Sequence, residues 1–164
     1  MGVKNYLIEG VSCTGKTTVC NELQRRGYQA IHGDRELAYQ GNPETGEKTN
    51  TASHENHIWD VDKVKALVDN KSEPVTFFCG GSRNFSKFIH LFDGVFVLEI
   101  DTETLNIRLD ARPENEFGGK KVERELIVRL HESKEDIPKN GIIIDATEPI
   151  EYIVDEIVRK SEGN

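Results

Sequence analysis

The feature that most constrains the fold of this chain is the segment GVSCTGKT at residues 10–17. It matches the pattern G-x-x-x-x-G-K-[ST], and the run YLIE at residues 6–9 comes directly before it. A strand that turns through glycines into a helix directs successive backbone N–H groups into a concavity that anionic oxygens can occupy. The sequence therefore predicts a β-strand, a phosphate-binding loop and a helix that begins near Lys16.

Each residue type in this motif has a physical reason. Gly10 and Gly15 permit backbone dihedral angles and close approaches that a Cβ would prevent. Lys16 supplies a positive charge for the β- and γ-phosphates, and the Thr17 hydroxyl is a candidate ligand for the accompanying Mg²⁺. The other nucleotide-binding candidates in the loop and the first helical turn are Ser12, Cys13, Thr14 and Thr18.

Beyond the loop, short β-branched or aromatic runs alternate with amphipathic stretches. Strands are predicted at residues 3–9, 28–32, 74–79, 94–100 and 141–145. Apolar residues at helical spacing lie between or after them, for example in residues 58–68 and 150–158. Helices of this kind bury their apolar faces against both sides of a mostly parallel sheet, so the predicted fold class is a three-layer α/β fold.

Length and composition indicate a single domain that covers residues 1–164. No apolar run reaches the ~18 residues of a membrane span, and the N-terminus lacks the plan of a signal peptide, so we expect a cytoplasmic protein without membrane contacts. Three cysteines are too few for a disulfide framework. A formal net charge of -8 disfavours nucleic acid as a partner.

Two polar segments interrupt the alternation of strands and helices. Residues 38–56 are rich in Gly, Thr, Asn and Glu and are too long for an ordinary connection, so they form a candidate substrate loop within an acceptor-binding region at about residues 34–58. Residues 111–121, ARPENEFGGKK, lie between two predicted helices, residues 102–110 and 121–134, and form a candidate lid.

The chain contains no N-K-x-D segment, which GTPase switches use to read guanine. With its phosphate loop and strand pattern, the whole chain resembles the small P-loop kinases, a group that includes adenylate-type nucleotide kinases, shikimate kinases and gluconate kinases. The resemblance implies a five-stranded parallel sheet of order 2-3-1-4-5 and a short lid. It also implies ATP and Mg²⁺ as cofactors, a small-molecule phosphate acceptor, and a monomer or homodimer.

The resemblance extends to four further segments. HGDRELAYQ is similar to the segment of nucleotide kinases that meets the acceptor, which implies roles there for Asp34 and Arg35. FFCGGSRN resembles the strand end where adenylate kinases hold the acceptor's phosphate, which implies the same role for Arg83. TLNIRLDAR resembles the helix that enters the lid, with Arg108 against the adenine and Arg112 at the transferring phosphoryl group. IIIDATEP resembles the loop on the other side of the adenine, so residues 146–149, from Ala146 to Pro149, are expected to line the base pocket.

One departure from the nucleotide-kinase pattern leaves the acceptor open. Cys79 ends the third predicted strand, where those kinases have an acid, so Asp34 becomes the candidate general base or Mg²⁺-shell carboxylate. The alternative for Asp34 is that it caps the next helix. The predicted acceptor is a nucleoside monophosphate or a nucleoside. Alternatives are a hydroxylated carboxylic acid such as shikimate or gluconate, and a nucleotide-binding or hydrolysing protein without an acceptor.

The segment HENHIWD, which joins the polar loop to a helix, allows two interpretations. His54, His57, Trp59 and Asp60 combine an aromatic ring with hydrogen-bonding groups, which suits an acceptor pocket. The favoured interpretation is structural, because Trp59 neighbours an apolar stripe and is expected to cover the core. A zinc site built on the histidines is not expected, because no further ligand lies at the required spacing.

Overall fold

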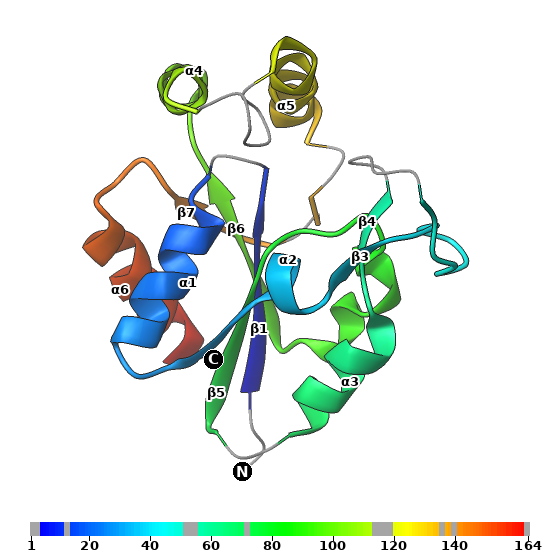
Figure 1. The fold of residues 1–164 in the computed structure, drawn as a ribbon. Coiled ribbons are helices and arrows are strands. Elements are labelled where there is room, and N and C mark those ends of the chain that lie inside the picture. The colour runs from blue at the N-terminus through cyan, green and yellow to red at the C-terminus, as the bar shows by residue number, and fades with distance from the viewer. Residues whose placement is uncertain are drawn as a thin grey trace.

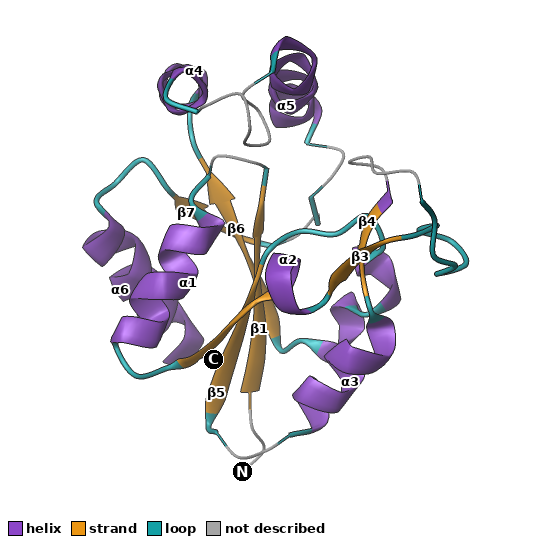
Figure 2. Ribbon diagram, in the orientation of Figure 1, coloured by secondary structure: helices purple, strands orange, loops and turns teal. Residues whose placement is uncertain are grey.

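The computed structural model describes residues 4–11, 14–50, 56–70, 73–112, 120–134, 137–138 and 141–162. Its centre is a parallel sheet of five strands: β1 (Lys4–Gly10), β2 (Gln29–His32), β5 (Val75–Cys79), β6 (Gly94–Glu99) and β7 (Ile142–Asp145). They lie in the order β2-β5-β1-β6-β7. Figure 2 shows the strands in orange between the purple helices. When these five strands are counted along the chain, the order is 2-3-1-4-5, so the predicted topology is confirmed.

Helices cover both faces of the sheet and its carboxyl edge. The helices are α1 (Lys16–Arg25), α2 (Gly33–Glu36), α3 (Val61–Asp69), α4 (Thr102–Asp110), α5 (Lys121–Ser133) and α6 (Ile150–Glu162). Figure 1 shows α1 and α6 on one face and α3 on the other, while α4 and α5 lie beyond the carboxyl ends of the strands. Two 3₁₀ turns, η2 (Phe85–Lys87) and η3 (Ile89–Leu91), follow β5. None of the described helices is both long enough and apolar enough to cross a bilayer.

The two faces of the sheet belong to two separate hydrophobic clusters, because successive side chains of a strand point to opposite sides. On β1, Tyr6 and Ile8 are buried in the cluster that includes residues of α1, α4, α5 and α6. Leu7, between them, is buried in the cluster of α3 and the 3₁₀ turns. The apolar run VTFFC of β5 likewise divides, with Phe77 in the first cluster and Phe78 in the second. This arrangement confirms the predicted three-layer fold.

The sequence pattern did not predict one element, an antiparallel hairpin beside the main sheet. β3 (Ala38–Gln40) begins the segment expected to be a loop, and β4 (His57–Trp59) follows that segment. Strands of three residues are too short to show an alternation of apolar and polar side chains. The hairpin places His57 at the carboxyl edge of the sheet.

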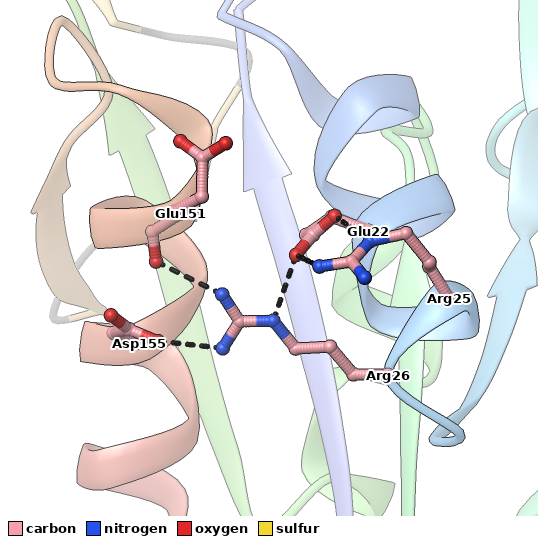
Figure 3. Close-up of polar contacts among 5 residues, drawn as sticks. All are labelled: Glu22, Arg25, Arg26, Glu151 and Asp155. Atoms are coloured by element: carbon pink, nitrogen blue, oxygen red, sulfur yellow. Dashed lines mark hydrogen bonds and ion pairs between the residues drawn. The ribbon is translucent and has the colours of Figure 1, made fainter.

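Polar side chains join α1 to α6 (Figure 3). Arg26, just after α1, contacts Asp155 of α6 at 2.6 Å and donates a hydrogen bond to the carbonyl oxygen of Glu151 at 3.2 Å. Glu22 holds both Arg26, at 2.8 Å, and Arg25, at 2.6 Å. The helix that follows the phosphate loop is therefore tied to the helix that follows β7.

Candidate functional site

A cavity of about 1390 Å³ lies at the carboxyl ends of the strands. This edge of an open parallel sheet is where ligands bind in α/β proteins. Its lining from the phosphate loop and the start of α1 consists of Gly10, Val11, Thr14, Gly15, Lys16, Thr17, Thr18 and Val19. Asp34, His57, Gly81 and Arg83 line the same cavity, as do Arg108, Arg112 and Ala146. The fold thus brings most of the predicted site residues into one space.

The phosphate loop has the backbone geometry that its glycines predict. Gly15 has φ +98°, in the left-handed region, and is the N-cap residue of α1. Because Gly15 has no side chain, it cannot cap the first-turn N–H groups, which remain available to an anion. At Gly10 a Cβ would lie 2.6 Å from Oγ1 of Thr14, so no larger residue fits there. Ser12 and Cys13 lie outside the described residues.

Lys16 lies across the mouth of this loop. Its Nζ donates a hydrogen bond to the carbonyl oxygen of Gly10 at 2.5 Å. Thr17 and Thr18 follow in the first turn of α1, and both are exposed. An ammonium group and two hydroxyls thus lie beside the helix N-terminus, whose partial positive charge attracts phosphate.

Two of the residues predicted to line a base pocket, Arg108 and Ala146, meet where α4 approaches the segment after β7. Nη2 of Arg108 donates a hydrogen bond to the carbonyl oxygen of Ala146 at 3.0 Å, and Ala146 is fully buried. A Cβ at Gly15 would lie 3.9 Å from Nη1 of Arg108, so the guanidinium also borders the phosphate loop. Pro149 is exposed and is absent from the cavity lining; its carbonyl oxygen accepts from the first N–H groups of α6.

Asp34 lines the same cavity from the short helix α2. Its Oδ1 accepts three hydrogen bonds, from Nε2 of His57 at 2.9 Å, Nε1 of Trp59 at 3.2 Å and the backbone N–H of Gly81 at 3.3 Å. Burial alone would raise the pKa of Asp34, but the His57 and Trp59 hydrogen bonds and the positive charge of Lys16 hold it below its ordinary value. Asp34 is therefore an ionised carboxylate that faces the phosphate loop.

The three other predicted arginines differ in their placement. Arg83 is partly buried and lines the cavity near Asp34, and its backbone N–H donates to the carbonyl oxygen of His57 at 2.9 Å. Arg112 lines the cavity just after α4. Arg35 is exposed and is not part of the cavity lining. Most of the predicted lid, residues 113–119, lies outside the described residues.

Sequence reasoning missed a buried acid beside the loop, Glu9. It ends the β1 run immediately before Gly10 and is only 1% exposed. Burial raises the pKa of Glu9 to about 8, although Lys16, Arg83 and the Gly10 N–H act in the opposite direction. A Cβ at Gly81 would lie 2.6 Å from Oε1 of Glu9 and 3.6 Å from Nζ of Lys16. β1 thus places a buried carboxyl group beside Lys16 and Gly81. The acid before the first glycine was the available signal.

Trp59 covers the core, as the structural interpretation of this segment expected. Trp59 is 1% exposed and stacks on Phe88, with ring centroids 5.5 Å apart and an interplanar angle of 5°. The side chain of Asp60 caps α3 by accepting from the backbone N–H of Lys63 at 3.2 Å. His54 lies outside the described residues. The sequence did not predict that His57 and Trp59 both contact Asp34.

The described residues contain no group of three His, Cys, Asp or Glu side chains that could hold a metal ion. The oxygens of Thr17 and Asp34 line the cavity, and oxygen is the ligand atom that Mg²⁺ prefers. Mg²⁺ bound with a nucleotide usually takes only one or two protein ligands and completes its shell with phosphate oxygens and water. These residues therefore fit Mg²⁺ that arrives with a nucleotide, and they do not form a cage for a free ion.

Comparison with known proteins agrees with this geometry. A family model described as an AAA domain, AAA_18, matches residues 7–129. No curated protein sequence matches the chain. A shikimate kinase from Aquifex aeolicus has a similar structure, with a TM-score of 0.60 at 20% identity over 98% of this chain and 97% of that one.

Two other solved structures are similar over nearly their whole length. A sugar kinase from Janibacter sp. HTCC2649 has a TM-score of 0.59 at 14% identity, over 96% of this chain and 93% of that one. A deoxyadenosine kinase from M. mycoides, solved with bound dATP, has a TM-score of 0.53 at 16% identity, over 97% and 99%. At these identities the likeness shows that the fold is that of small P-loop kinases.

Proposed function

Because this chain belongs to the AAA domain family AAA_18, whose model covers about three quarters of it, we propose that it is an ATP-dependent phosphotransferase for a small-molecule acceptor. The acceptor we propose is a nucleoside or a nucleoside monophosphate. One observation carries the proposal: one cavity is lined both by the phosphate loop with Lys16 and by Asp34 and Arg83. Donor and acceptor sites in one space are what direct phosphoryl transfer requires.

In this proposal the triphosphate occupies the loop end of the cavity. Lys16 leaves the Gly10 carbonyl to contact the β- and γ-phosphates, and the base lies beside Arg108 and the Ala146 segment. Thr17 would hold Mg²⁺ directly, and Asp34 would contact it only through water. Bound Mg²⁺ supplies positive charge that offsets the negative charge of the phosphate oxygens. The first-turn N–H groups of α1 add the partial charge of the helix end.

The position of Asp34 supports an acceptor that reacts through a hydroxyl group. The carboxylate takes the hydroxyl proton as the acceptor oxygen bonds to the γ-phosphorus, and the bond from that phosphorus to the β–γ bridging oxygen breaks to release ADP. Arg112 stabilises charge on the transferring group. A phosphate acceptor is already an anion at neutral pH and needs no base. Between the two proposed acceptors, this favours a nucleoside.

A second candidate acceptor is a hydroxylated carboxylic acid of the shikimate or gluconate type. The specific observation in its favour is that Arg83 and Asp34 line the same end of the cavity. A guanidinium can hold a carboxylate through two parallel hydrogen bonds while the carboxylate of Asp34 receives a hydroxyl. With a nucleoside only Asp34 of this pair would contact the acceptor, because a nucleoside carries no anionic group for Arg83 to bind.

The test is to measure ADP release with ATP and Mg²⁺ in the presence of a panel of compounds. The panel contains deoxyadenosine and other nucleosides, their monophosphates, shikimate and gluconate, and mass spectrometry identifies the phosphorylated product. We expect product from a nucleoside, with Lys16→Ala abolishing turnover at an unchanged melting temperature. Equal ADP release with and without every compound would indicate hydrolysis and would overturn the proposal.

A further inference from the structure

His57 reaches Asp34 because of where the short strand β4 is fixed. β4 pairs with β3, in a register that sets Gln40 opposite His57 and Ala38 opposite Trp59. On its other side, the amide side chain of Asn84 makes two hydrogen bonds with the backbone of Trp59. Oδ1 of Asn84 accepts from its N–H at 3.1 Å, and Nδ2 donates to its carbonyl oxygen at 3.0 Å. Asn84 is buried, so these bonds are shielded from water.

Two side chains of β4 converge on one oxygen of Asp34. Residues 57 and 59 are two positions apart in a strand, so their side chains lie on the same face. Together with the Gly81 N–H, they direct three donors at Oδ1. Within the described part of the chain, the hydrogen bonds of the Asp34 carboxylate fall on Oδ1, which leaves Oδ2 for a ligand.

The two β4 donors have different surroundings. The indole of Trp59 is held in the core by its stack on Phe88, and it fills space that exists because Gly33 and Gly80 have no Cβ. A Cβ at Gly80 would lie 2.8 Å from the indole ring. The side chain of His57 is 29% exposed and lines the cavity. Trp59 is thus a core residue that also donates a hydrogen bond to Asp34, whereas the side chain of His57 lies in the cavity.

The backbone of His57 also contacts Arg83, the candidate anion-binding residue of the acceptor site. Its carbonyl oxygen accepts the hydrogen bond from the backbone N–H of Arg83 at 2.9 Å. A single residue therefore connects the candidate base, through its ring, with the candidate anion-binding arginine, through its main chain. This double connection explains why a strand of only three residues is placed between α2 and the segment after β5.

We propose that His57 is a positioning residue: it fixes the carboxylate of Asp34 so that Oδ2 faces the acceptor hydroxyl. This inference rests on the proposed function for its catalytic consequence, whereas the orientation of Asp34 can be measured without turnover. The matched variants are His57→Ala, which removes the donor, and His57→Gln, whose Nε2 can replace the imidazole Nε2. His90→Ala, at an exposed histidine of η3 outside the cavity lining, is the control.

The kinetic test uses the panel compound that wild type phosphorylates fastest. We expect His57→Ala to lower kcat about 10- to 100-fold, the size of effect that a misplaced catalytic group produces. The KM for ATP should stay within about twofold, since His57 lies at the acceptor end. His57→Gln should recover most of kcat, and His90→Ala should match wild type. Equal kcat losses in His57→Ala and His57→Gln would overturn the proposal, and so would a change confined to KM.

Crystal structures of the two His57 variants separate this inference from the proposed function. We expect the Asp34 carboxylate to rotate away from Gly81 in His57→Ala and to keep its orientation in His57→Gln. If Asp34 keeps its orientation in His57→Ala, the positioning role is wrong whatever the enzyme phosphorylates. If wild type phosphorylates no compound while Asp34 rotates as expected, the proposed function fails and the structural part of this inference stands.

Discussion

The guanidinium of Arg108 donates a hydrogen bond to the carbonyl oxygen of Ala146 at 3.0 Å, and this contact joins α4 to the segment after β7 beside the phosphate loop. Both residues line the cavity, in the part that we propose for the base. A guanidinium plane in this position can stack on an adenine ring.

Arg108→Ala is therefore expected to weaken ATP binding by about 5- to 10-fold, the effect of losing one cation–π contact. Binding of inorganic tripolyphosphate should change much less, because that ligand has no base. Calorimetric titration with each ligand measures both. Arg35→Ala, at an exposed arginine outside the cavity lining, is the control. Equal losses for ATP and tripolyphosphate would show that Arg108 binds phosphate instead.

Arg112 lines the cavity just after α4, where the proposal assigns it to the transferring phosphoryl group. Charge develops on the equatorial oxygens during transfer, so Arg112→Ala should reduce kcat by on the order of 10³. The affinity for ATP should fall far less. Steady-state kinetics and calorimetry together give the two quantities. A loss of ATP affinity with an unchanged kcat would contradict the assigned role.

Glu9 makes stability depend on pH in the direction opposite to that of most acids. Burial raises the pKa of Glu9 from 4.5 to about 8, so between these values the folded state binds more protons than the unfolded state. Its contribution to stability therefore falls as pH rises from about 4.5 to about 8. We expect Glu9→Gln, which stays neutral, to gain melting temperature relative to wild type across this range. If the difference in melting temperature between Glu9→Gln and wild type does not vary with pH, the pKa of Glu9 is not raised by burial.

Glu22 makes stability depend on pH in the direction opposite to that of Glu9. Its hydrogen bonds to Arg25 and Arg26 (Figure 3) lower the pKa of Glu22 from 4.5 to about 2. Its contribution to stability is therefore fully present above about 4.5 and is lost as pH falls through about 2.

Glu22→Gln should accordingly lower the melting temperature at pH 7, and its difference from wild type should shrink as pH falls through this window. Glu151→Gln is the matched control, because Glu151 contacts Arg26 through its carbonyl oxygen. Thermal unfolding followed by circular dichroism measures both variants. If the two substitutions have equal effects at pH 7, the Glu22 carboxylate does not stabilise the fold through Arg25 and Arg26.

The sheet was predictable because its strands are short, apolar and separated by amphipathic helices. The run VTFFC is apolar on both faces, as a central parallel strand must be. The phosphate loop was predictable because its function needs glycine and lysine at fixed spacing. By contrast, β3 and β4 have three residues each and are separated by 16 positions, so neither strand carries a periodic signal.

The candidate site also contains residues whose positions were predictable from the sequence and residues whose positions were not. Asp34 and Arg83 follow strands, and the carboxyl ends of parallel strands meet at one edge, so their proximity could be expected. The contact between His57 and Asp34 depends on the register of β4 and on its hydrogen bonds to Asn84, which no local pattern encodes. Glu9 follows the apolar residues 6–8 of β1, and Gly81 packs closely against its carboxyl group, a contact that no local pattern encodes.

The central claim is that the loop around Lys16 binds the phosphates of a nucleoside triphosphate. Calorimetric titration of ATP with Mg²⁺ into wild type and into Lys16→Ala tests it most directly. We predict one binding site per chain in wild type, and an association constant at least about 10-fold lower in Lys16→Ala, because a charged hydrogen-bond donor is lost. Absence of binding to wild type, or equal affinity of the two proteins, would contradict the account.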